Sequence, residues 1–170
     1  MRVTGLLCAW VAAMACAPGA PAPPPAGSAP SDPAPAAAAD TVRGTVAEVG
    51  SEPGTWMVLR TPGGAVVRLD GERPLLRAVV GLEVMVRGTP AAGGLAVREL
   101  RVRSSNGVAA VDGVLERRGG GYVLVTSERG TLPVPHLPAA LRGMVGARVW
   151  LAGPLDRAPD SSGVISEPVR

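Results

Sequence analysis

The chain has 170 residues, of which 18 are proline and 23 are glycine, and its 17 basic residues are all arginine. With 14 acidic residues the formal net charge is only +3. Charges of both signs alternate along the chain, which indicates a mixed-sign surface and argues against the basic stripe of a nucleic-acid-binding protein. The absence of phenylalanine requires a core of valine, leucine and alanine, which favours β-strands.

Residues 1–16 have the pattern of an export signal, because an apolar run is followed by small residues three and one before Cys16. The run is too short to span a bilayer, so we expect a signal peptide. Residues 13–16 (Ala-Met-Ala-Cys) resemble the lipobox of bacterial lipoproteins, and this resemblance implies a lipid on Cys16 and attachment to a membrane. An ordinary signal peptidase would accept Ala13 and Ala15 at the same bond, so a soluble exported protein is the alternative.

Residues 17–40 consist mostly of proline and alanine. Repeated proline removes backbone donors and biases its neighbours to extended conformations. This composition predicts a disordered, polyproline-like linker that holds the rest of the chain away from a membrane.

From residue 41 onward the pattern predicts two similar units. In the first we expect strands over 42–49, 56–61 and 65–69, a short helix over 72–80, and strands over 82–88 and 95–102. In the second we expect strands over 111–117, 122–127 and 131–135, a short helix over 138–145, and strands over 149–153 and 164–169. Prolines in the third strand of the second unit predict an edge strand. Residues 76–88 and 141–153 share Leu-Arg, Val-Gly, Val and a final Gly at matching places, which indicates a duplicated unit.

Three strands, a short helix and two strands is the element order of the OB-fold. The units over 41–103 and 108–170 resemble the modules of exported bacterial OB-fold proteins, which include lipoproteins. The resemblance also rests on a Val-x-Gly in strand one of each unit, at residues 42–44 and 111–113. It implies an all-β chain of two tandem, five-stranded OB-like barrels, with an SH3-like barrel or a small open sandwich as the alternative. Because a core of about 60 residues is marginal, we expect the units to pack on each other or on a partner.

The residue inventory does not favour catalysis or metal binding. His136 is the single histidine, and both cysteines lie in the first 16 residues, so a zinc site is not expected. Asp70 and Glu72 are interpreted as a polar turn. No histidine stands beside Ser127, Ser161 or Ser162, so no nucleophile is identified. We therefore predict a non-enzymatic protein without a cofactor or metal.

A ligand surface is predicted where aromatic residues and arginine share the outward sides of strands. It comprises Trp56, Arg60, Arg68, Tyr122 and Trp150. Apolar anchors beside arginine suit an anionic or glycan-like ligand or another protein of the cell envelope. The alternative is that these aromatic residues cover the end of a barrel or the contact between the two units.

The sequence thus predicts an exported lipoprotein of the cell envelope that acts as a non-enzymatic binding or scaffolding module. A soluble periplasmic ligand-binding protein of the same fold is the first alternative. An oligonucleotide-binding protein is less favoured, because export and the lack of a basic groove count against it. The sequence leaves the ligand, the membrane and the oligomeric state open.

Overall fold

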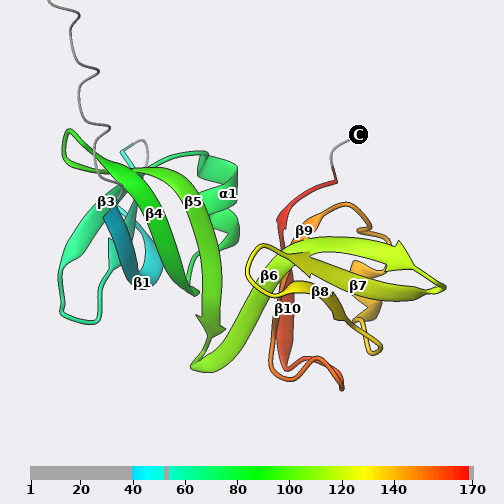
Figure 1. Cartoon of the computed structure of the whole chain (residues 1–170). Helices are drawn as coiled ribbons and strands as arrows, with labels where there is room; N and C mark the ends of the chain where they lie inside the picture. The colour runs from blue at the N-terminus through cyan, green and yellow to red at the C-terminus, as the bar shows by residue number, and fades with distance from the viewer. Residues whose placement is uncertain (1–39, 52–53, 169–170) are drawn as a thin grey trace, which may run out of the picture. The chain divides into compact units, whose positions relative to one another are not determined.

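The computed structural model describes residues 40–51 and 54–168 (Figure 1). The predicted export signal, the lipidation site Cys16 and the linker up to residue 39 lie outside these residues. The described part consists mainly of β-strands with one short α-helix, so the prediction of an all-β chain is confirmed. None of the helices in this part is long and apolar enough to cross a membrane.

The first module, residues 40–105, has the predicted order of elements. These are β1 (Asp40–Val49), β2 (Trp56–Arg60), β3 (Val66–Asp70), α1 (Arg73–Ala78), β4 (Glu83–Ala91) and β5 (Gly94–Ser105). β1 pairs with β2 and β4, β2 with β3, and β4 with β5, all antiparallel, and β3 pairs with β5 in parallel. The pairings therefore run in a closed ring, in which each strand has a neighbour on both sides.

The core of the first module follows from the alternation of side chains along its strands. Val84 and Val86 of β4 are fully buried, and Arg87 is exposed. Leu59 of β2 and Leu100 of β5 pack in the same cluster. Burial of each such side chain stabilises the fold by about 1.5–3 kcal/mol, so aliphatic residues alone can supply the core.

The second module, residues 108–166, repeats most of this pairing scheme. Its elements are β6 (Val108–Arg118), β7 (Gly121–Thr126), β8 (Gly130–Pro133), the 3-10 helix η1 (Ala139–Leu141), β9 (Arg148–Ala152) and β10 (Ser161–Ser166). β6 pairs with β7 and β9, β7 with β8, and β9 with β10, all antiparallel. Within the described residues β8 and β10 do not pair, so the ring closure of the first module is not repeated. The proline-containing β8 is an edge strand, as predicted.

The predicted short helices differ between the two modules. In the first, α1 has Pro74 in its first turn, and Gly81 behind it has a φ of 83°. In the second, the helix predicted over 138–145 is wrong, because only the 3-10 turn η1 forms. Pro138, which precedes η1, has an extended backbone with a φ of −53° and a ψ of 140°. Gly143, a poor helix former, follows η1.

The glycine behind each helical element makes the same contact in both modules. The amide of Gly81 donates to the carbonyl of Val46 at 2.9 Å, and the amide of Gly146 donates to the carbonyl of Leu115 at 2.7 Å. Val46 and Leu115 stand at equivalent places in strand one of each module, and each returns a hydrogen bond to the residue after the glycine. The repeated Val-Gly in the sequence thus marks the point where strand one meets the turn into strand four.

A tight hairpin joins the two modules (Figure 1). Asn106 and Gly107 form its turn, with φ values of 50° and 79°. Positive φ at both turn residues matches the right-handed twist of a two-residue β-hairpin, which is why Asn-Gly is favoured there. Only two residue pairs continue the ladder, Ser104 with Ala109 and Ser105 with Val108, before β6 turns to pair with β9.

The two modules also share a hydrophobic core. Trp150, Ala152 and Ile165 of the second module pack in the same cluster as the buried residues of β1 to β5. A separate cluster fills the second module around Leu115 and Leu124. The prediction that the units pack on each other is therefore confirmed.

Candidate functional site

Of the five residues predicted to bind a ligand, the structure brings only Trp56 and Arg68 together. The indole of Trp56 is 45% exposed, and the guanidinium carbon of Arg68 lies 5.6 Å from the centre of its ring. Both line a small hollow of about 140 Å³ between β2, β3 and the start of α1. Arg60 lies at the opposite end of β2, where it pairs with Val66.

Trp150 is not exposed, which corrects the expectation of an outward indole. Its side chain is 9% exposed and belongs to the core cluster of the first module. Strand alternation places it on the same face as Arg148, as predicted, but other parts of the chain cover this face. The indole also lies over Gly163 of β10, where a Cβ atom would come within 2.7 Å of its Nε1 atom. A ligand-binding role for Trp150 stays a prediction. As a buried residue, Trp150 also contributes to the packing of the core.

Tyr122 lies at an apolar groove with a volume of about 570 Å³ in the second module. The groove is lined by the start of β7, by β8, by the turn before β7 and by the loop between β9 and β10. Its lining residues include Tyr122, Val123, Leu132, Pro133, Pro135 and Leu155. Arg118 and Asp156 are the charged residues of the lining, and the side chain of Arg118 forms an ion pair with Glu116 at 2.7 Å. The groove is therefore apolar and carries no free excess of positive charge.

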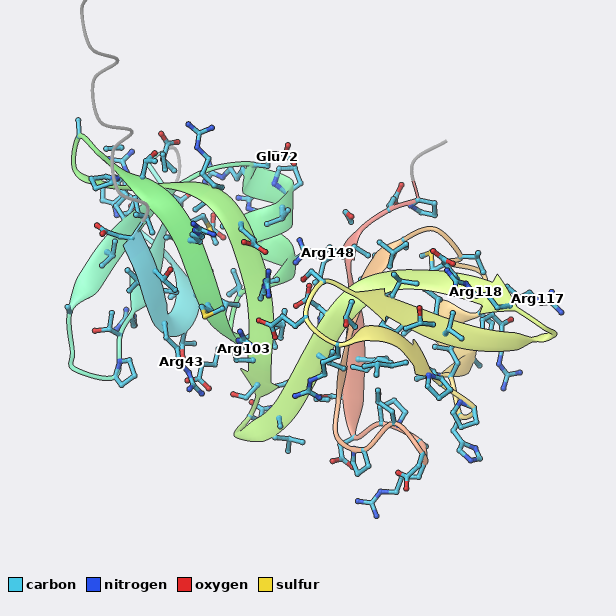
Figure 2. The ribbon with its side chains drawn as sticks, in the orientation of Figure 1. Arg43, Glu72, Arg103, Arg117, Arg118 and Arg148 are labelled. Carbon is cyan, nitrogen blue, oxygen red and sulfur yellow. The ribbon has the colours of Figure 1, made fainter. Side chains whose placement is uncertain are left out.

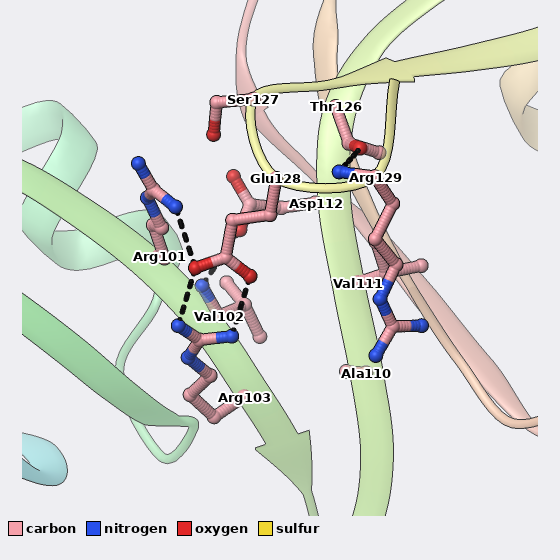
Figure 3. Close-up of a pocket in the computed structure, with 10 residues that line it drawn as sticks. All are labelled: Arg101, Val102, Arg103, Ala110, Val111, Asp112, Thr126, Ser127, Glu128 and Arg129. Atoms are coloured by element: carbon pink, nitrogen blue, oxygen red, sulfur yellow. Dashed lines mark hydrogen bonds and ion pairs between the residues drawn. The ribbon is translucent and has the colours of Figure 1, made fainter. Parts of the chain in front are cut away.

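A polar junction between the modules was not predicted from the sequence. Figure 3 shows the carboxylate of Glu128, in the turn between β7 and β8, pointing between Arg101 and Arg103 of β5. Both terminal nitrogens of Arg103 donate to this carboxylate, at 2.7 and 2.6 Å, and Arg101 lies at 2.5 Å. Because the partners are 27 and 25 residues apart and in different strands, neither periodicity nor spacing could have paired them.

Asp112 and Arg148 extend this junction along the edge of β5. The backbone amide of Val102 donates to Oδ1 of Asp112 at 2.8 Å, and Nε of Arg148 donates to Oδ2 at 2.9 Å. Arg148, which lies between the two modules in Figure 2, also donates to the carbonyl of Leu100. The Asp112 side chain is 8% exposed, so its charge is buried and paired. The side chains of Asp112 and Arg148 thus form hydrogen bonds with backbone groups of β5 at positions where β6 no longer pairs with this strand.

Stability should depend on the ionisation of Glu128. Hydrogen bonds from Arg103 and then from Arg101 lower its pKa from 4.5 to about 2. The folded-state pKa lies below the unfolded one, so this stabilisation is present above pH 4.5 and is lost as the pH falls toward 2. The side chain is 35% exposed and solvent screens the pair, so we expect the contribution to be only about 1 kcal/mol.

Urea unfolding of the wild type and of Glu128→Gln at several pH values between 7 and 2 tests this expectation. The wild type should be about 1 kcal/mol more stable at pH 7, and the difference should vanish near pH 2. A difference that does not change with pH would show that the carboxylate charge contributes nothing.

Within residues 40–51 and 54–168, no group of three or more His, Cys, Asp and Glu side chains is arranged to hold a metal ion. His136 is exposed in the segment behind β8. Ser127 lines the small pocket beside Glu128, where Arg101, Arg103 and Arg129 are the cationic neighbours.

No family model, no curated protein and no solved structure matches the chain. The assignment of a function therefore rests on the sequence pattern and on the geometry of the groove and the junction.

Proposed function

We propose that this protein is an exported, non-enzymatic binding module of the cell envelope, built from two tandem OB-like modules and anchored through a lipid on Cys16. The order of elements and the pairing ring of the first module support the OB-like assignment. The export pattern of residues 1–16 and the proline-rich linker support the location. A soluble periplasmic protein of the same fold differs from the anchored form in that Cys16 takes up no labelled fatty acid.

The observation that carries the binding function is the apolar groove of the second module. Leu132, Tyr122 and Leu155 are each only partly buried there, although all three are large and Tyr122 and Leu155 also pack on the second core. A concave apolar surface with a few polar groups at its rim is the usual form of a binding site. A tyrosine in its lining supplies contact area at a low entropic cost.

The chemistry of the groove favours an extended protein segment with apolar side chains. The charged residues of its lining, Arg118 and Asp156, have opposite signs, and Arg118 is already paired with Glu116. A single-stranded nucleic acid needs a cationic track and several stacking platforms, and the groove offers Tyr122 as its only aromatic residue. The ligand class that fits best is a segment of another envelope protein.

A short peptide with a known strand-forming sequence tests the groove. We choose a capped peptide with the sequence of residues 94–100 of this chain, because it is extended in β5, has apolar Leu95 and Val97 two residues apart and carries one Arg and one Glu. We expect NMR shift changes in β7, β8 and the loop between β9 and β10. Tyr122→Ala should weaken binding by about tenfold or more, as expected for loss of an aromatic anchor.

Trp56→Ala is the control, because Trp56 is an exposed aromatic residue of β2 that does not line the groove. It should leave the affinity unchanged. Absence of shifts with the peptide, or equal loss of affinity in both variants, would contradict the proposed function. Preferential binding of a single-stranded oligonucleotide would favour the nucleic-acid alternative.

A further inference from the structure

One strand pairing of the first module has no counterpart in the second. In the first, β3 pairs in parallel with β5, with Arg68 opposite Gly94 and Asp70 opposite Ala96. The corresponding strands of the second module are β8 and β10, and β8 pairs with β7 alone. One long edge of β8 is therefore without a strand neighbour in the described part of the chain.

The apolar groove lies at this free edge. Leu132 of β8 pairs with Leu124 of β7, which is fully buried, so both side chains point to the core face of the sheet. Leu155, from the loop between β9 and β10, lines the groove with Leu132. The second core is thus accessible at the place where the first module has its closing strand.

The backbone of β8 can accept a further strand at this edge. The amide of Val134 donates to the carbonyl of Tyr122 at 2.9 Å, so residues 130, 132 and 134 direct their backbone groups to β7. Because backbone groups alternate in direction along a strand, those of Thr131 and Pro133 point to the free edge. Proline has no amide hydrogen, so the edge offers the amide of Thr131 and two carbonyl oxygens.

We infer that the ligand of the groove binds as an added β-strand along β8 and completes the open ring of the second module. This inference rests on the proposed function and names the form of its partner, which is a short, extended segment of another protein. Apolar side chains on one face of the segment fill the groove beside Leu132 and Tyr122. Its backbone pairs with Thr131 and with the carbonyl of Pro133, as in other cases of strand addition to a sheet edge.

The edge also limits what can bind. A free edge strand invites uncontrolled pairing, and proteins block this with short strands and prolines. β8 has four residues, and Pro133 removes one of its outward donors. The partner is therefore selected by its side chains in the groove, because the backbone alone supplies few hydrogen bonds.

Backbone methylation of the peptide probe tests strand addition without altering the protein. The capped peptide of residues 94–100 is prepared with a single N-methyl group at each amide in turn. If the peptide is a strand on β8, methylation should weaken binding by about tenfold only at the two amides, two residues apart, that donate to the carbonyls of Thr131 and Pro133, since each methyl group removes a hydrogen bond and adds a clash. Methylation of the other amides should change the affinity by less than about twofold.

Hydrogen exchange at Thr131 supplies a second measurement on the unmodified chain. Saturating peptide should slow exchange of this amide by about tenfold or more, because it becomes a donor in the new ladder. Binding that depends on Tyr122, tolerates every methyl group alike and leaves Thr131 unprotected would overturn strand addition but keep the groove as the site. Absence of peptide binding would overturn both proposals.

Discussion

Replacement of Trp150 by alanine should lower the free energy of unfolding by about 3–5 kcal/mol, the range for removing a buried tryptophan. The indole is 9% exposed and packs with the residues that fill the first module. Its loss leaves a cavity where the modules share a core and uncovers Gly163 beneath it. Urea unfolding followed by circular dichroism measures the change without relying on the deleted fluorophore.

Trp56→Ala is the control for this prediction. Trp56 is 45% exposed, and the guanidinium of Arg68 lies over its ring. Loss of a cation–π contact at an exposed site costs about 0.5–1 kcal/mol, so this variant should remain close to the wild type. Equal destabilisation by the two substitutions would contradict the assignment of Trp150 to the shared core.

The elements of the fold could be predicted because they depend on local patterns. The sequence pattern predicted the strands, and the repeat that contains Val-Gly indicated a duplicated unit, in which Gly81 and Gly146 make equivalent hydrogen bonds. Closure of the ring of paired strands could not be predicted from local patterns. It depends on whether strands far apart in the sequence meet, as β3 and β5 do and as β8 and β10 do not.

The candidate site shows the same limit. The period of two placed Trp56 outward correctly, and it also placed Trp150 on the face of Arg148, but periodicity does not say what covers a face. The contact that covers Trp150 depends on the junction between the modules. One local signal for that junction is present in the sequence, since Asn106-Gly107 favours a tight hairpin turn at the boundary between the two units.

Glycine in strand one should be essential in both modules. An added Cβ at Gly113 would lie 2.4 Å from the carbonyl oxygen of Val125 in β7, and one at Gly44 would lie 2.4 Å from that of Arg60 in β2. Both obstacles are backbone atoms, which can move only if the strand pair separates. This close approach explains why the Val-x-Gly of strand one occurs in each repeat.

Gly113→Ala should therefore destabilise the protein by about 3 kcal/mol, at the upper end of the cost of overpacking. Gly44→Ala should have a similar effect. Gly143→Ala is the matched control, because no atom beyond its chain neighbours lies within 4 Å of its added Cβ and its φ is not positive. Urea unfolding of the three variants compares them. If Gly113→Ala is as stable as Gly143→Ala, strands one and two are further apart than this packing requires, and the repeat does not encode their contact.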